Sequence, residues 1–262
     1  MSGAAPSATP DGPGTDRLLE ATRRAEQAHF WWIGFRSFVE PLVARATAGT
    51  GDPRILDCGC GTGANLALLG QYGRAYGFDL SPDGPRYARD YGQPRVARAS
   101  IAEIPFGDGV FHLVTAFDVL YSLPEDLEER AVGEMHRVLR RGGYTIVNVA
   151  ALNILRGNHS IFGGEVRRST RRRLRRVLTR GGFTVERLTY TNASLFPLML
   201  AVRTAQRLTG LARPEEAGTD MAIPPSFVNA TLAGLLRIEA RALRRFNMPI
   251  GSSLLALARK RS

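Results

Sequence analysis

One short segment constrains the fold of this chain more than any other: an apolar run that ends in a glycine-rich turn. Residues 55–58 read Ile-Leu-Asp-Cys, and Gly59, Gly61 and Gly63 follow at alternate positions. Glycine permits backbone conformations and close approaches to a ligand that a side chain would block. A helical pattern begins at Ala64. A buried strand, a tight glycine turn and a helix are together typical of the first half of a nucleotide-binding βα unit.

An acidic residue ends the next predicted strand, which covers residues 74–79. At that place Asp79 can accept hydrogen bonds from both ribose hydroxyls of an adenosine. With Ala64 in the last position, the loop also satisfies the loose dinucleotide pattern. These residues by themselves therefore leave two cofactors open, a nicotinamide dinucleotide and S-adenosylmethionine.

Apolar runs and helical patterns alternate along most of the chain. Strands are predicted at 54–58, 74–79, 95–98, 110–116, 144–150, 183–191 and 253–258, and helices at 64–69, 82–90, 125–140 and 170–180. A helical region covers 194–246 and is broken by a polar loop at 213–225. Strands that alternate with helices predict an α/β fold, in which helices cover both faces of a parallel sheet.

The predicted elements divide the chain into five parts. We expect a disordered tail at 1–14, an N-terminal helical lid at 15–48, a cofactor-binding α/β domain at 49–192, an inserted helical cap at 193–250, and the last strand with its tail at 251–262. Asp16 is a plausible cap for a first helix that starts at Arg17 and continues to about Ala46.

Composition excludes several classes of protein. The net charge is +11, but Lys260 is the one lysine among 35 basic residues, a skew that indicates a GC-rich genome rather than nucleic-acid binding. Cys58 and Cys60 are too few for a disulfide framework or a zinc site, so no metal is expected. The longest apolar run, 193–202, is too short to span a membrane. We expect a cytoplasmic protein, with peripheral membrane contact as the alternative.

Three further stretches add to the loop and Asp79. Residues 104–114 read IPFGDGVFHLV, residues 117–120 read FDVL, and residues 134–143 read EMHRVLRRGG. Together they resemble the class I S-adenosylmethionine-dependent methyltransferases, in the bacterial type 11-like branch that carries LPF-x-D-x-x-F-D-x-V and RVL-x-PGG. Residues 29–36, HFWWIGFR, resemble the opening of a subgroup of these enzymes. The resemblance implies a Rossmann-like, mostly parallel sheet of seven strands.

The resemblance also implies a cofactor site. The methionine part of S-adenosylmethionine would be surrounded by Asp57, Gly59, Gly61 and Gly63, and its carboxylate would pair with Arg36. The ribose would be held by Asp79. The adenine ring would contact Leu80 and Ile101, Ser100 would replace the usual aspartate at the adenine amine, and Phe117 would lie on the pocket floor.

Methyl transfer from a sulfonium needs alignment, and a base only where the acceptor carries a proton. The candidates for that base are Tyr121, His159 and Glu165. Trp31 and Trp32 are interpreted either as a lid that contacts substrate or as core residues that anchor a helix. Arg167 and Arg168 begin an arginine-rich stretch that is either a solvated face or a site for an anionic group.

The function predicted from these residues is methyl transfer to a small-molecule or lipid-linked acceptor, apolar or anionic, by a monomer or homodimer. One alternative is C-methylation of a prenyl diphosphate or another anionic isoprenoid. Another is a protein that binds S-adenosylmethionine without methylating, such as a cyclase. An RNA methyltransferase is disfavoured by the arginine bias.

Overall fold

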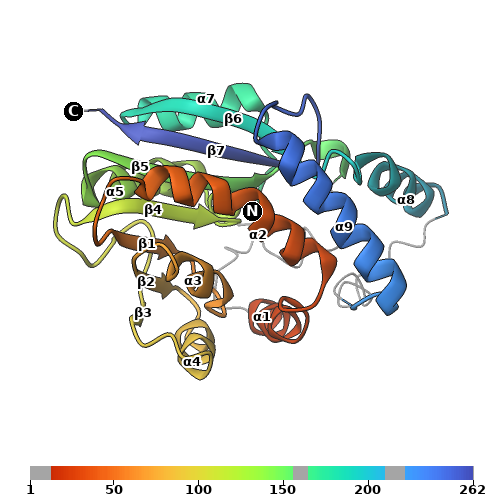
Figure 1. Cartoon of the computed structure of the whole chain (residues 1–262), viewed down its shortest axis with the longest axis horizontal. Coiled ribbons are helices and arrows are strands. Elements are labelled where there is room, and N and C mark those ends of the chain that lie inside the picture. Colours follow the sequence, from red (N-terminus) through yellow and green to blue (C-terminus); the bar gives the residue numbers. More distant parts are fainter. Residues whose placement is uncertain (1–12, 156–164, 210–221, 262) are drawn as a thin grey trace, which may run out of the picture.

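The computed structural model describes residues 13–155, 165–209 and 222–261. A seven-stranded sheet forms the centre of these residues (Figure 1). Its strands are β1 (Arg54–Cys58), β2 (Arg74–Asp79), β3 (Val96–Arg98), β4 (Phe111–Phe117), β5 (Leu139–Ala150), β6 (Phe183–Thr191) and β7 (Ser253–Lys260). Their spatial order is β3-β2-β1-β4-β5-β7-β6, and β7 runs antiparallel to both of its neighbours. The predicted mostly parallel sheet is confirmed.

Helices cover both faces of this sheet. They are α1 (Pro13–Ala25), α2 (Phe30–Thr47), α3 (Ala64–Leu69), α4 (Asp83–Asp90), α5 (Glu125–Val138), α7 (Arg171–Arg180), α8 (Phe196–Thr209) and α9 (Ser226–Leu243), with short 3₁₀ turns at Leu120–Ser122 and Asn153–Leu155. Apolar side chains of α2, α3 and α9 form one core cluster with the sheet, and those of α5 and α7 form the other. None of the helices in the described ranges is long and apolar enough to cross a membrane.

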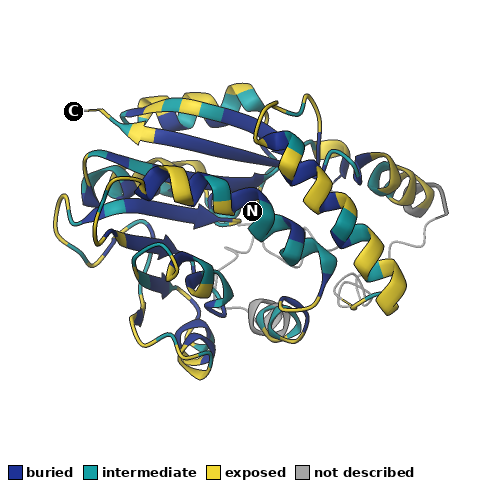
Figure 2. Ribbon diagram, in the orientation of Figure 1, coloured by how far each residue is buried: buried dark blue, intermediate teal, exposed yellow. Residues whose placement is uncertain are grey.

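Cover on both faces explains the sequence of the central strands. Six of the seven residues of β4 are buried, so the strand reads as an almost continuous apolar run instead of an alternating one (Figure 2). The predicted boundary between α5 and β5 is wrong: the helix expected to reach residue 140 ends at Val138, and the strand expected from residue 144 begins at Leu139, which already pairs with Phe111 in the sheet.

The long helix α9 lies along α2 and completes the cover of that face. Gly34 of α2 lets the two helices approach closely, since a Cβ there would lie 2.3 Å from Leu236 Cδ1. The inner side of α9 buries Ala233, Leu236, Ala240 and Leu243. This part of the predicted cap therefore shares its core with the sheet domain.

The N-terminal helix differs from the prediction in two ways. It starts at Pro13 rather than Arg17, because proline is well accommodated in the first turn of a helix, where its missing N–H needs no partner. The helical stretch expected up to Ala46 is also broken after Ala25, and a second helix begins at Phe30. The side chain of His29 caps this second helix: its Nδ1 accepts a hydrogen bond from the Trp31 N–H at 3.1 Å.

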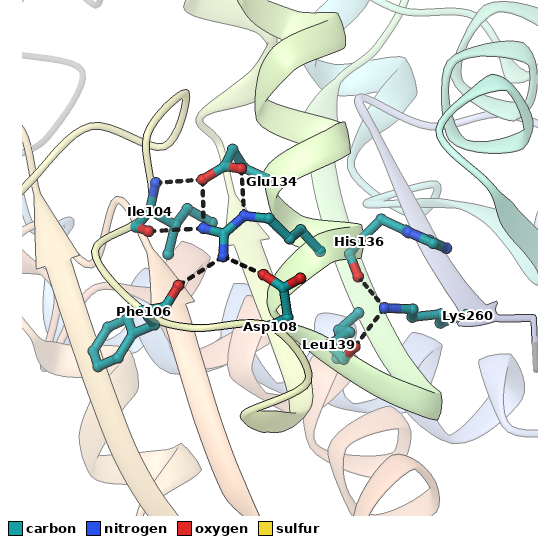
Figure 3. A network of polar contacts seen from close by, with 8 residues as sticks. Ile104, Phe106, Asp108, Glu134, His136, Leu139 and Lys260 are labelled. Carbon is teal, nitrogen blue, oxygen red and sulfur yellow. Dashed lines mark hydrogen bonds and ion pairs between the residues drawn. The ribbon is translucent and has the colours of Figure 1, made fainter.

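Two of the stretches behind the family resemblance meet in a polar network (Figure 3). The guanidinium of Arg137 donates to the carbonyl oxygens of Ile104 and Phe106 at 3.0 and 2.8 Å, and it pairs with Asp108 at 2.8 Å and Glu134 at 2.6 Å. These contacts hold the loop before β4 against α5. None of these printed contacts involves the glycine loop that follows β1.

Candidate active site

The glycine loop leaves β1 at the carboxyl edge of the sheet. The φ angles of Gly59, Gly61 and Gly63 are 74°, 51° and 82°, values that residues with a side chain rarely adopt. A Cβ on Gly59 would also lie 2.4 Å from a methyl group of Val119, in the segment that follows β4. The sequence pattern therefore reflects a real backbone requirement, and the loop sits between the ends of β1, β2 and β4.

Asp79 ties this loop to the end of β2. Its Oδ2 accepts a hydrogen bond from the Gly61 N–H at 2.8 Å, and its Oδ1 accepts one from the Ser81 N–H at 2.9 Å. Burial raises the pKa of this carboxyl group, and hydrogen bonds from the backbone N–H groups of Ser81, Gly61 and Leu80 oppose the rise. A carboxylate oxygen can accept more than one hydrogen bond, so both oxygens keep acceptor capacity.

Asp57 is buried within β1, with 1% of its surface exposed. It lies opposite Thr115 of β4, whose Oγ1 donates to Asp57 Oδ1 at 2.6 Å. Burial raises the pKa of Asp57 to about 7; the bond from Thr115 opposes the rise, and the charge of Asp79 adds to it. The loop is thus flanked by two carboxylates that disfavour each other's charge.

A third carboxylate, which the sequence analysis missed, reaches the loop from the N-terminal segment. Both oxygens of the buried Glu26 accept from Thr62 Oγ1, at 2.6 and 2.7 Å. Arg36 lies close by, and its Nη2 donates to the Glu26 carbonyl at 2.8 Å. Burial raises the pKa of Glu26 and lowers that of Arg36. The corner between α1 and α2 therefore docks on the loop, a contact for which the sequence holds no local pattern.

The aromatic segment at the start of α2 extends this contact toward β4. His29 is buried, and its ring stacks on Phe30 at a centroid distance of 4.4 Å and meets Trp32 edge-on at 5.2 Å. Phe35 packs edge-on against Phe117 at 5.1 Å. Trp31 and Trp32 are partly exposed, which fits both a lid and a core anchor.

Helix α9 clamps the same corner through one side chain. Asn229 Oδ1 accepts from the Phe30 N–H at 2.8 Å, and its Nδ2 donates to the Ala28 carbonyl at 2.8 Å.

Asn229→Ala is expected to lower the free energy of unfolding by about 1–3 kcal/mol, because it leaves both backbone groups without their partner. Thermal melting measures the loss. Thr231→Ala, on the exposed side of the same helix, is the matched control; an equal effect of both changes would contradict the clamp.

The two residues predicted to contact the adenine ring, Leu80 and Ile101, differ in exposure to solvent. Leu80 is 38% exposed, so its side chain can cover an apolar ring, whereas Ile101 is buried in the core. Ser100 orders its own turn, since its Oγ accepts from the Ala102 N–H at 3.2 Å.

A second group of polar side chains gathers where β4 and β5 end. Asp118 follows β4 with a φ of 60°, a strained value for a residue with a side chain. Its Oδ1 accepts from Asn148 Nδ2 at 2.9 Å. The buried Asn148 Oδ1 has no partner among the described residues. Desolvation by the surrounding protein raises the pKa of Asp118, and the charge of Glu165 adds to the rise, whereas the hydrogen bond from Asn148 and the charge of Arg168 oppose it.

Two of the predicted catalytic residues belong to this group. Burial and the charges of Asp118 and Glu165 raise the pKa of Tyr121 well above its ordinary value, so its hydroxyl stays protonated at neutral pH and can donate a hydrogen bond. Glu165 accepts from Arg168 Nε at 2.8 Å and from Arg168 Nη2 at 3.2 Å. The third candidate, His159, lies outside the described residues.

Adjacent arginines diverge at this point. Arg168 also donates to the Ala151 carbonyl at 3.2 Å, which places it at the end of β5. Arg167 instead pairs with the buried Glu128 of α5 at 3.2 Å, together with Arg173 of α7. Of the two predicted anion-binding residues, the structure thus brings only Arg168 to the polar group that contains Asp118.

Residues 56–147 match the family described as a methyltransferase domain. A protein of Encephalitozoon cuniculi named as a methyltransferase is 32% identical over 134 residues, which are 51% of this chain and 57% of that protein. The demethylmenaquinone methyltransferase of Lysinibacillus sphaericus is 28% identical over 117 residues, 42% of this chain and 49% of the relative. The chain spans about half the length of these curated relatives.

Solved structures share the fold. The [4+2]-cyclase SpnF superposes with a TM-score of 0.56 at 22% identity, and the match covers 86% of this chain and 80% of the cyclase. Others are S-adenosylmethionine-dependent methyltransferases, from Mesorhizobium loti and Archaeoglobus fulgidus. At such identities the likeness establishes the fold alone.

Proposed function

We propose that the chain transfers a methyl group from S-adenosylmethionine to a small-molecule or lipid-linked acceptor that carries a proton on the reacting atom. The match of residues 56–147 to a methyltransferase domain supports the proposal. The observation that carries the proposal is the meeting of two polar groups at one edge of the sheet. The acidic glycine loop follows β1, and the group around Asp118 follows β4, the next strand in the sheet.

The residues around the loop fit a cationic adenosine cofactor. Asp57 and Asp79 raise the energy of each other's charged form, and neither pairs with a described arginine or lysine. Positive charge beside them relieves this repulsion. Asp79 retains acceptor positions for ribose hydroxyls, and Leu80 offers an exposed apolar surface for the adenine. Arg36 lies next to the loop and is proposed to meet the methionine carboxylate.

Bound there, the cofactor supplies a methyl group already activated for displacement by its sulfonium. The protein then has to orient the acceptor and take its proton. We assign the proton to Asp118, whose raised pKa brings it nearer to neutral pH and whose exposure lets it return the proton to solvent. Asn148 holds the carboxylate through its Nδ2 group. The hydroxyl of Tyr121 is protonated and can donate a hydrogen bond to the acceptor molecule.

The other predicted functions receive less support. In the described part of the chain Arg167 and Arg168 each pair with a carboxylate of the protein. These ion pairs give no particular support to binding of a prenyl diphosphate by either arginine. A cyclase remains the second candidate because SpnF, which is one, shares the fold.

The test is Asp118→Asn, with Asp126→Asn as the matched control on the exposed side of α5. Transfer of labelled methyl from S-adenosylmethionine to a panel of phenols, amines, carboxylic acids and prenylated quinols identifies an acceptor. We expect Asp118→Asn to lower kcat by roughly 10²–10⁴ while calorimetric affinity for the cofactor is kept. Unchanged transfer in this variant contradicts the assignment of the base. Turnover of an acceptor without incorporation of label supports the cyclase instead.

A further inference from the structure

Helix α9 has a second apolar face that no described part of the chain covers. Its inner side packs on α2, but Phe227 and Ile238 point outward and are 82% and 60% exposed. At 100° per residue these two side chains fall within about 20° of each other. Val228 and Leu235 lie about 80–100° further round the helix from Phe227, both on the same side, and are 43% and 38% exposed. Figure 2 shows exposed residues recurring along the outer side of α9.

Arginines continue this face toward the carboxyl end of the helix. Arg237, Arg241, Arg244 and Arg245 are all exposed, and none of them forms an ion pair within the described ranges. The single acidic residue of α9 is Glu239. It is buried and accepts hydrogen bonds from the Ala193 and Ser194 N–H groups, both at 2.9 Å. The outer face is therefore apolar at one end, cationic at the other, and free of acidic side chains.

We propose that this face, made of Phe227, Val228, Leu235 and Ile238 with the four arginines, docks on a membrane surface that contains anionic lipids. Apolar side chains inserted at the level of the acyl chains, beside arginines that reach the headgroups, are the pattern of interfacial helices. Arginine stems lie along apolar surface while the guanidinium groups stay among phosphates.

Charge complementarity favours this occupant over a second copy of the chain. A two-fold symmetric contact places the same surface on both partners. A contact of this kind buries the four arginines of both copies, and α9 has no exposed acidic side chain to pair with them. An anionic headgroup layer supplies the opposite charge, and the chain as a whole carries a net charge of +11.

The location of α9 connects this surface to the proposed active site. Asn229, in the first turns of the helix, clamps the corner between α1 and α2, and Glu26 in that corner contacts the glycine loop. Asn229 and Phe227 lie on opposite sides of α9, so docking through α9 places that corner about one helix diameter, roughly 10 Å, behind the docking face. The proposal does not depend on methyl transfer, because vesicle binding is measured without cofactor or acceptor.

The chain also contains a matched control surface. Helix α7 carries exposed arginines at 172, 175 and 176, but it packs on the opposite face of the sheet and contributes no exposed large apolar side chain. Removing three charges from α7 changes the net charge as much as removing three from α9. The two variants therefore separate docking through one face from attraction of the whole molecule.

The experiment is co-sedimentation of the full chain with vesicles of phosphatidylcholine, alone or with about 30% phosphatidylserine. We expect binding to the anionic vesicles. Phe227→Ser with Ile238→Ser lowers the partition coefficient at least about tenfold. Arg241→Gln, Arg244→Gln and Arg245→Gln together lower it roughly fivefold for each charge removed. Arg172→Gln, Arg175→Gln and Arg176→Gln together leave it within about twofold.

Three results would overturn the proposal. They are a wild-type chain that stays in the supernatant, a double serine variant that binds like wild type, and an equal loss in the α7 and α9 variants. A dimer in sedimentation velocity that the double serine variant abolishes, without vesicle binding, assigns the face to self-association instead. All the substituted side chains are exposed, so melting temperatures should match wild type. If the double variant melts lower, Phe227→Ser alone repeats the test at the end of the helix.

Discussion

Replacing Asp79 with alanine is expected to weaken the binding of both S-adenosylmethionine and S-adenosylhomocysteine by roughly ten- to a hundredfold, the cost of losing a partly buried, hydrogen-bonded carboxylate. Two effects add. The variant loses the acceptor for the ribose hydroxyls, and it releases the Gly61 and Ser81 N–H groups that now hold the loop to the end of β2. Isothermal titration calorimetry measures the change with each ligand.

Two further variants sharpen this test. Asp83→Ala removes a carboxylate from neighbouring α4 that pairs with Arg86 at 2.9 Å, and it should leave the affinity unchanged. Asp79→Asn should bind nearly as weakly as the alanine variant, because one end of its amide places a donor against a backbone donor. Full affinity in Asp79→Ala would disprove the role of this residue, and binding of NAD without either sulfur ligand would overturn the cofactor.

The second large effect concerns Asp57 and depends on pH. Its pKa is raised from 3.8 to about 7, so the folded chain holds this proton more tightly than the unfolded chain does. Between these two values the unfolded state binds fewer protons, and the contribution of Asp57 to stability therefore falls as pH rises, then levels off above about pH 7. Asp57→Asn removes this dependence.

We expect the stability of Asp57→Asn relative to wild type to improve by about 2–3 kcal/mol between about pH 5 and pH 8, a relative shift in melting temperature of roughly 4–10 °C. The comparison of two pH values cancels any constant cost of the new amide. Cofactor affinity should fall at the same time, because a cationic ligand loses an anionic neighbour. If the difference in melting temperature between Asp57→Asn and wild type is the same at every pH, Asp57 does not lower the stability of the fold as pH rises.

Asp52→Asn is the control for that experiment. Asp52 is exposed, and its pKa is lowered, chiefly by the hydrogen bond from Arg74. A lowered pKa stabilises the fold as pH rises. Its replacement should therefore not reproduce the gain seen for Asp57→Asn at higher pH.

The sequence by itself was enough to predict the framework of this site. The glycine loop, the strand before it and Asp79 follow one another within about 25 residues, and each depends on local rules: buried strands are apolar, and positive φ angles favour glycine. Predicted bounds such as 64–69 for α3 and 183–191 for β6 agree with the structure, because turn residues and glycines mark their ends.

The tertiary structure alone decided which side chains complete the site. Glu26 meets Thr62 across 36 positions of the chain, and Asn148 meets Asp118 across 30, so no local pattern records either contact. Arg167 and Arg168 are neighbours of the same type, yet one pairs with Glu128 and the other with Glu165. Which partner a flexible charged side chain takes depends on the elements packed beside it. That packing brings together β4, β5 and the segment before α7, and it is a property of the whole fold.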